Sequence, residues 1–205
     1  MKILSFDTSN SLASVAIIDN GKILSNHITK QSSQQAEKLF QLIEECFSEA
    51  KLKLSDMNLV SITNGPGSFT GVRIALAAAL GLQTASQVEF IALTNFQVLS
   101  WHAKQIHPNK PIAVVLDARR EQVYLQLFNK DLENISEPML ISKEELPEYI
   151  SSDMVLIGDG IDSELNLIAN AEILAKASEF YWQNKSYHDL IPLYIRQPDV
   201  AEPKI

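Results

Sequence analysis

Hydrophobic and polar positions along the first half of the chain follow two alternating periods, which predict strands and helices in turn. Lys2–Asp7 is an apolar run that ends in an acid, as expected of a buried strand. Two further apolar runs flank Asn20-Gly21, and this dipeptide between such runs is a strong hairpin signal. From Ala36 to Ala50 the apolar residues recur at helical spacing. In all, the pattern predicts strands at 2–7, 12–18, 22–28, 59–64 and 90–93 and helices at 36–50, 70–86 and 95–105.

The pattern restarts after His107–Pro111, a segment typical of a linker. Ile112–Asp117 is again an apolar run ending in Asp, and placing Asp117 on Asp7 aligns the following apolar positions without a gap. The halves are therefore interpreted as two copies of one strand–Asp–turn–strand unit, although chance alignment of alternating apolar residues stays open. A helix at 143–150, a strand at 155–158 and a shorter helical region follow. The expected architecture is α/β, with two subdomains at 1–106 and 112–205, the second one reduced.

Composition and charge exclude several classes of protein. The 205 residues are 46% hydrophobic and 20% charged, which excludes disorder over the whole chain. The net charge is −8: residues 1–110 hold nine Lys/Arg and eight Asp/Glu, and the rest hold eight and seventeen. No basic run is present that would neutralise several phosphates. We therefore expect no tight binding of nucleic acid by this chain alone.

Cysteine and histidine usage argues against metal and thiol chemistry. Cys46 is the single cysteine and falls on the apolar side of a predicted helix, so a buried, inert thiol is expected. The four histidines are scattered, with no pair at metal-binding spacing. We expect no metal site.

Two features favour a cytoplasmic protein that is not inserted in a membrane. An acid at position 7 interrupts the apolar run that a signal peptide would need. The uncharged apolar run Ile74–Val88 is too short and too polar to span a bilayer. A single cysteine is also usual in a reducing compartment.

Asp7-Thr8-Ser9 lies where the first strand ends, at the edge where sheets of this class bind ligands. An acid and two hydroxyls there are suited to a hydrated cation or a phosphate. The alternative is that Asp7 and Ser9 only cap the turn through their own backbone.

A second motif joins a predicted strand to a predicted helix. It is glycine-rich, and Ser68 or Thr70 is a plausible N-cap. A helix N-terminus attracts anions, but the motif lacks the lysine of a Walker loop. The alternative is a tight turn with Phe69 in the core. The motif residues are Gly65, Pro66, Gly67, Ser68, Phe69, Thr70, Gly71 and Arg73.

The helix that follows has small residues on more than one side and no charge from Ile74 to Val88. A sheet buries only one stripe of a helix, so the other side needs cover. Small residues let another helix approach closely. That cover comes either from this chain or from a partner.

The pairing of Ile3–Ser9 with Gly65–Ile74 resembles the TsaB (YeaZ) family, the dimerization subunits of the bacterial tRNA threonylcarbamoyladenosine complex. Leu116–Tyr124, Gly158–Gly160 and Pro192–Arg196 extend the resemblance over nearly the whole chain. The resemblance implies the duplicated fold of actin, sugar kinases and heat-shock chaperone ATPases. It also implies a non-catalytic subunit, with no catalytic residue of its own, that is required to modify the adenosine next to the tRNA anticodon.

In that family the catalyst is a related TsaD-type subunit with a metal-binding histidine pair. By ungapped placement Asn95 and Leu99 stand at those positions here, so the resemblance implies no metal. A TsaE-type ATPase completes the family complex, and tRNA is reached only through it. No cofactor is expected to bind this chain tightly; the resemblance leaves open an ATP or ADP at the complex interface, facing Asp7, Thr8 and Ser9, and a homodimer of the isolated chain.

Family dimers pack two helices of each first subdomain into a four-helix bundle, here about 34–50 and 70–86. Gln34 stands where the family often has His, a departure at the start of the first of these helices. The residues expected to contact the partner are Phe40, Ile43, Phe47, Gly71, Ala75, Ala78, Ala79 and Leu82, or their neighbours one position round the helix.

The residues leave two other functions to consider. A self-sufficient small-molecule kinase or ATPase of the same fold needs a second phosphate loop, but Asp117–Glu121 has no glycine and bulky side chains. A glycoprotease-like peptidase lacks an evident nucleophile or metal ligands. Fold alone decides neither.

Overall fold

The computed structural model describes residues 1–29, 31 and 34–196. Its first sheet has five strands in the order β3-β2-β1-β4-β5. The β2–β3 turn confirms the predicted hairpin, since Asn20 and Gly21 both have positive φ, as its tightest turn type requires. β1 runs antiparallel to β2 and parallel to β4. The strands are β1 (Lys2–Asp7), β2 (Ser14–Asp19), β3 (Lys22–Ile28), β4 (Leu59–Thr63) and β5 (Glu89–Leu93).

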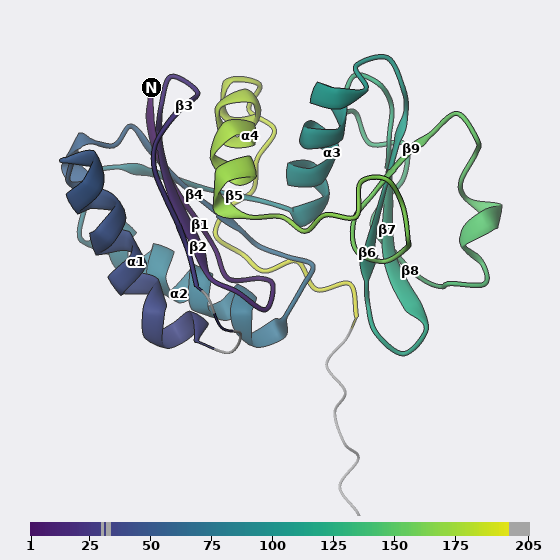
Figure 1. Ribbon diagram of the computed structural model, residues 1–205, viewed down its shortest axis with the longest axis horizontal. Coiled ribbons are helices and arrows are strands. Elements are labelled where there is room, and N and C mark those ends of the chain that lie inside the picture. Colours follow the sequence, from purple (N-terminus) through teal and green to yellow (C-terminus); the bar gives the residue numbers. More distant parts are fainter. Residues whose placement is uncertain (30, 32–33, 197–205) are drawn as a thin grey trace, which may run out of the picture.

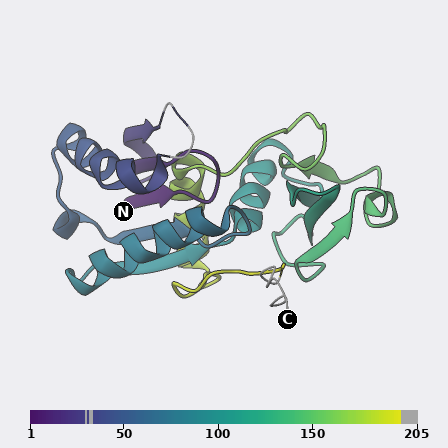
Figure 2. The same ribbon diagram turned by 90° about the horizontal axis from the view of Figure 1, so that it is seen from below.

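Helices cover both faces of this sheet (Figures 1 and 2). α1 (Gln35–Ala50) and α2 (Phe69–Thr84) pack on one face, where Leu4 and Phe6 of β1 enter their core. α4 (Ala171–Gln183) packs on β1, β2 and β4 from the other side, where Ile3 joins a different core. Alternate side chains of β1 therefore pack into two different hydrophobic cores, one on each face of the sheet.

The second sheet repeats this plan in the order β8-β7-β6-β9. β6 runs antiparallel to β7 and parallel to β9, as β1 does to β2 and β4. This duplicated plan is that of the actin-like fold, which the family resemblance implies. The strands are β6 (Ile112–Asp117), β7 (Gln122–Phe128), β8 (Met139–Ser142) and β9 (Val155–Ile157).

The gap-free alignment of the halves is wrong by one position. It places Leu116 on Phe6, yet Phe6 lies in the core beneath α1 and α2, whereas Leu116 lies in the core between the sheets. Neighbouring strand residues point to opposite faces, so a shift of one exchanges them. Asp117 is accordingly exposed and Asp7 is buried.

The two halves exchange helices between their sheets. α3 (Asn95–Ile106), from the first half, contacts β6 and β9 of the second sheet. α4, from the second half, lies on the first sheet and also contacts α3 (Figure 1). The subdomain limits predicted along the chain, 1–106 and 112–205, therefore do not coincide with the packing units.

Elements of the first half match their predicted bounds to within two residues, but one helix of the second half does not form. Where 143–150 was expected to be helical, the structure has β8 before it and one short 3-10 turn at Leu146–Glu148. Pro147 lacks the backbone N–H that a longer helix would use. No helix within the described ranges is long and apolar enough to cross a membrane.

Candidate functional site

Asp7 lies inside the first subdomain and is 1% exposed. Its Oδ1 accepts hydrogen bonds from the Ser9 backbone N–H at 2.9 Å, from Ser9 Oγ at 2.6 Å and from Thr63 Oγ1. Its Oδ2 accepts one from Asn10 Nδ2 at 3.1 Å. Burial raises the pKa of Asp7, and these hydrogen bonds offset part of the rise. The carboxyl is used by the fold itself, as the turn-capping interpretation expects.

This burial gives a pH-dependent prediction for Asp7→Asn. The folded-state pKa of Asp7 lies above the ordinary value of 3.8. The carboxyl therefore stays protonated up to a higher pH in the folded chain than in the unfolded chain. The stability from Asp7 is therefore present below that value and is lost as pH rises through the folded-state pKa. We expect the wild-type free energy of unfolding, relative to that of Asp7→Asn, to fall as pH rises from 4. Urea denaturation of both proteins between pH 4 and 8 measures it; a relative gain with rising pH would contradict it.

The glycine-rich motif packs directly against the turn after β1. Ser68 N donates to the Ser9 carbonyl at 2.7 Å, and Thr8 Oγ1 donates to the Gly71 carbonyl at 2.6 Å. Ser68, rather than Thr70, is the N-cap of α2 and accepts from Gly71 N at 3.2 Å. A Cβ at Gly67 or Gly71 would overlap a backbone carbonyl of this turn. The close approach of two backbones is what requires glycine here.

The alternative role for Phe69, a plug in the core, is wrong. Its ring is 44% exposed at the start of α2. The loop is therefore closed by backbone hydrogen bonds and not by an aromatic anchor.

Asn95 ties the two loops together. Its Nδ2 donates to Ser9 Oγ at 2.9 Å and to the Pro66 carbonyl at 2.7 Å, and its backbone N–H donates to Gly65 at 2.8 Å. From the sequence, Asn95 stands out only as a position where the TsaD-type subunit has a histidine. No local pattern signals this role, since the partners lie about 30 and 86 residues away.

The two positions that correspond to the histidine pair of the TsaD-type subunit do not fit a metal ion. Asn95 directs its amide N–H groups at protein acceptors, and Leu99 is fully buried among apolar residues. Across the described residues, no group of three or more His, Cys, Asp or Glu is placed to hold a metal. Cys46 is buried, as predicted, and burial raises the pKa of its thiol to about 11.

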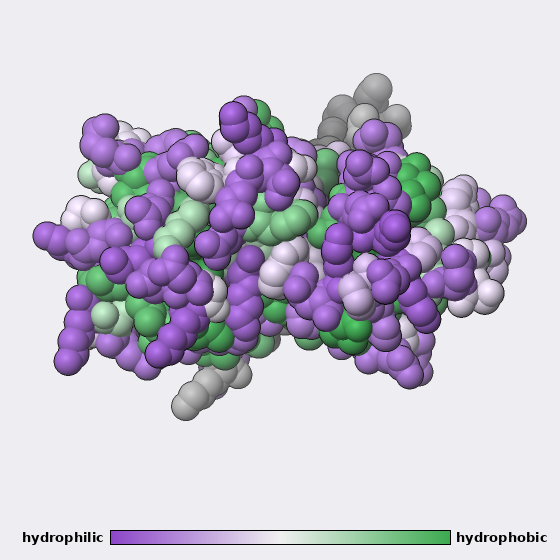
Figure 3. Space-filling model, turned by 90° about the horizontal axis from the view of Figure 1, so that it is seen from above, coloured by the Kyte–Doolittle hydropathy of each residue, from purple (hydrophilic) through white to green (hydrophobic). Residues whose placement is uncertain are grey.

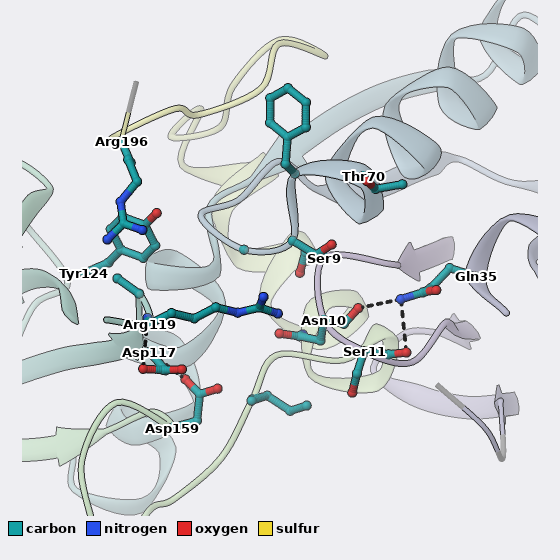
Figure 4. A pocket seen from close by; sticks show the side chains of 15 residues that line it. Ser9, Asn10, Ser11, Gln35, Thr70, Asp117, Arg119, Tyr124, Asp159 and Arg196 are labelled. Carbon is teal, nitrogen blue, oxygen red and sulfur yellow. Dashed lines mark hydrogen bonds between the residues drawn. The ribbon is translucent and has the colours of Figure 1, made fainter. Parts of the chain in front are cut away.

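A cleft of about 580 Å³ separates the two subdomains (Figure 4). The first subdomain contributes polar side chains around Asn10, and Gln35 Nε2 bonds the Asn10 and Ser11 carbonyls at 2.9 and 3.0 Å. From the opposite wall Arg119 extends across the cleft toward Asn10. The polar lining residues are Ser9, Asn10, Ser11, Gln35, Ser68, Thr70, Asp117, Arg119, Tyr124, Asp159 and Arg196.

The far wall of the cleft is charged and strained. Arg119, Arg120 and Glu121 have φ of 61°, 54° and 57°, a run of left-handed backbone that is costly for residues other than glycine. Asp117 Oδ1 accepts from Arg119 N at 3.1 Å, and Asp159 Oδ1 accepts from Asp117 N at 3.0 Å. Burial raises the pKa of Asp159, and the Asp117 charge adds to the rise. The turn presents side chains, not a glycine backbone, to the cleft.

The structure corrects the orientation of α2. Ala75 and Ala79 are fully buried against the first sheet, and Gly71 and Ala78 are buried with them. The expected partner contacts at these positions therefore face inward. Their small side chains let α2 lie close to the sheet. The side of α2 that faces solvent holds Arg73, Ala77, Leu80, Gly81 and Thr84.

Of the other residues expected at a partner surface, Ile43 is buried in the core, and Phe47 and Leu82 are half-buried. Phe40 of α1 and Leu80 of α2 are 52% and 47% exposed. α1 and α2 contact each other, so their outward sides adjoin. We call the solvent-facing sides of these two helices the outer helical face. By contrast, the face in Figure 3 is mainly hydrophilic, with small separate apolar areas.

Gln34 is the residue just before α1, and its side chain does not cap that helix. Its Nε2 donates to Gln31 Oε1 at 3.2 Å. The departure from the family at this position thus lies at the exposed start of α1.

Comparison with known proteins agrees with this geometry. The family model described as "TsaD: tRNA N6-adenosine threonylcarbamoyltransferase" matches residues 22–164. The tRNA threonylcarbamoyladenosine biosynthesis protein TsaB of Escherichia coli is 25% identical, covering 87% of this chain and 83% of that protein. TsaB of Buchnera aphidicola subsp. Schizaphis graminum is 28% identical, covering 77% of this chain and 78% of its own.

Among solved structures, YeaZ from Pseudomonas aeruginosa superposes with a TM-score of 0.79 at 24% identity. The superposition covers 94% of this chain and 99% of that one, so the fold is shared from end to end. The chain belongs to the TsaD family of tRNA N6-adenosine threonylcarbamoyltransferases and, within it, to the TsaB (YeaZ) group.

Proposed function

We propose that this chain is a non-catalytic partner subunit in tRNA threonylcarbamoyladenosine modification, pairing in the cytoplasm with a TsaD-type catalytic subunit. The TsaB relatives carry the name of this pathway. The observation in the chain itself is the outer helical face, where α2 exposes Ala77, Leu80 and Gly81 and the neighbouring α1 exposes Phe40. Exposed small and apolar residues on a helix favour close contact with a partner's helices.

The use of the loops supports a chain without catalysis of its own. Asp7 has its oxygens engaged by Ser9, Thr63 and Asn10, and the glycine-rich motif has its backbone engaged by Thr8 and Ser9. These groups hold the two loops together, whereas a kinase of this fold would present them to phosphate in the cleft. A self-sufficient kinase or ATPase is therefore not favoured.

Further components are proposed on the same basis. A homodimer of isolated chains would use the outer helical face, so it would compete with the TsaD-type subunit. A TsaE-type ATPase and tRNA would join only the assembled complex. An ATP or ADP at the complex interface would meet the cationic side chains of the cleft, Arg119 and Arg196, rather than the buried Asp7.

Reconstitution tests the proposal. The chain, a TsaD-type subunit and a TsaE-type ATPase from one organism are combined singly and together with tRNA, ATP and a threonylcarbamoyl donor. Mass spectrometry of nucleosides then measures threonylcarbamoyladenosine. We expect product with the full set, little without this chain and none with this chain alone. Product from the chain alone, or full activity without it, would overturn the proposal.

A further inference from the structure

Three side chains form an ordered cation–aromatic cluster at the first turn of α2. The Cζ of Arg73 lies 3.8 Å from the centre of the Phe69 ring and 5.9 Å from that of Tyr194. Arg73 Nε donates to Tyr194 Oη at 3.0 Å, and the two ring centres are 5.3 Å apart. Phe69 and Tyr194 nevertheless remain 44% and 42% exposed, and Arg73 is exposed too. The cluster is thus held in one geometry while facing solvent.

Tyr194 is fixed there by the segment that carries it. After α4 the chain bridges the edge of β5, where His188 and Ala92 exchange two backbone hydrogen bonds of 2.9 Å. Asn64 then holds the segment from both sides: its Nδ2 donates to the Ile191 carbonyl at 2.9 Å, and its own carbonyl accepts from Leu193 N at 2.8 Å. The segment runs on toward the second sheet (Figures 1 and 2). Binding at the cluster would therefore cost little ordering.

The cluster offers the chemistry of a carboxylate site. A guanidinium has five N–H donors in a planar fork, and the bond to Tyr194 uses only the Nε donor. Within the described chain no carboxylate pairs with Arg73. The fork matches a carboxylate with two parallel hydrogen bonds, and flanking aromatic rings exclude water around it. Arginine and tyrosine are also enriched among residues that dominate binding energy at protein interfaces.

Its position joins the cluster to the outer helical face. Arg73 is spaced by helical turns from Ala77, Leu80 and Thr84, and it is the only charged residue of α2. A single fixed charge at one end of the otherwise uncharged α2 sets the register and direction of a partner. One arginine on a chain of net charge −8 is a poor match for the many phosphates of a nucleic acid.

We propose that Phe69, Arg73 and Tyr194 anchor an Asp or Glu side chain of the TsaD-type subunit at the edge of the outer helical face. This inference rests on the proposed function and adds the chemistry of the contact.

The test measures the dissociation constant for the TsaD-type subunit at 50 and 500 mM salt, by calorimetry. Arg73→Ala is expected to weaken binding by about 30-fold or more at 50 mM. Arg73→Lys is expected to recover little, since an ammonium cannot present the fork, although its stem still packs on Phe69. Arg73→Ala should lose part of the salt dependence of the wild type, whereas Arg73→Lys, which keeps the charge, should retain most of it. Lys22→Ala, which removes the same charge from an exposed site on β3, should bind as the wild type does.

Several outcomes would overturn the inference. Wild-type affinity of Arg73→Ala at both salt concentrations, with Leu80→Glu unable to bind, would remove the anchor but leave the proposed partner face. Normal assembly of Arg73→Ala, with tRNA affinity lost from the complex, would assign Arg73 to a phosphate instead. If the wild type itself does not bind a TsaD-type subunit, the proposed function fails first. Thermal denaturation of each variant alone separates binding loss from misfolding, and Arg73→Lys serves where Arg73→Ala is unstable.

Discussion

Leu80→Glu is expected to leave this chain folded and to abolish its pairing with a TsaD-type subunit. Leu80 is 47% exposed on the outer helical face, between Ala77 and Gly81, where a partner helix can approach closely. A carboxylate introduced there would be buried without a partner, at a cost of several kcal/mol. The dissociation constant should rise by about 100-fold or more. Size-exclusion co-elution and calorimetry measure the pairing, and threonylcarbamoyladenosine in the reconstituted reaction should fall with it.

Ala79→Glu is the matched control for the same helix. Ala79 precedes Leu80 but is fully buried against the first sheet, so the new charge would enter the core. We expect this variant to lose its cooperative thermal unfolding, whereas Leu80→Glu keeps it. Pairing of Leu80→Glu at wild-type affinity would place the partner face elsewhere on the chain.

The helix that carries Ala79 and Leu80 could be predicted from the sequence, but the opposite environments of these two residues could not. The sequence predicts that α2 is a helix and that its side away from the sheet packs on another element. Both predictions follow from its composition. Its orientation did not follow, because α2 is small and apolar on all sides and gives no polar stripe to mark the solvent. α1 carries Glu37 and Glu44 on its exposed side, and these acids give part of its orientation. Of its residues expected at the partner surface, Phe40 is exposed but Ile43 is buried. The orientation of α2 is set by its packing on the first sheet.

Topology marks a second limit. The duplicated plan was visible in the sequence, since two apolar runs end in Asp7 and Asp117. The exchange of α3 and α4 between the sheets could not be predicted, because the sequence of a helix does not indicate which sheet it packs on. The one-residue error in alignment has the same origin: both registers keep apolar alternation, but each sends Leu116 to a different core.

The candidate site was predicted least well. The sequence shows the two motifs, yet the residues that hold them together, Thr63 and Asn95, come from the end of β4 and the start of α3 and belong to neither motif. The cation–aromatic cluster likewise joins Arg73 to Tyr194, 121 residues apart. Such contacts depend on strand order and loop length together, and single-sequence patterns contain neither.

The close contact between the two loops leads to a prediction of strong destabilisation at Gly71. A Cβ at Gly71 would overlap the Thr8 carbonyl oxygen, and Thr8 is itself fixed by the hydrogen bond from its Oγ1 to the Gly71 carbonyl. Backbone atoms on both sides leave no flexible group to move aside. We expect Gly71→Ala to reduce the free energy of unfolding by roughly 3 kcal/mol or more.

Gly81→Ala provides the contrast within the same helix. Nothing lies within 4 Å of a Cβ at Gly81, which is solvent-exposed and near the end of α2. Alanine there removes only the conformational freedom of glycine, so stability should rise by about 0.5–1 kcal/mol. Urea denaturation of the isolated chain measures both variants against the wild type. Equal stability of the two would mean that the turn after β1 can move away from α2, and that this backbone contact does not require glycine.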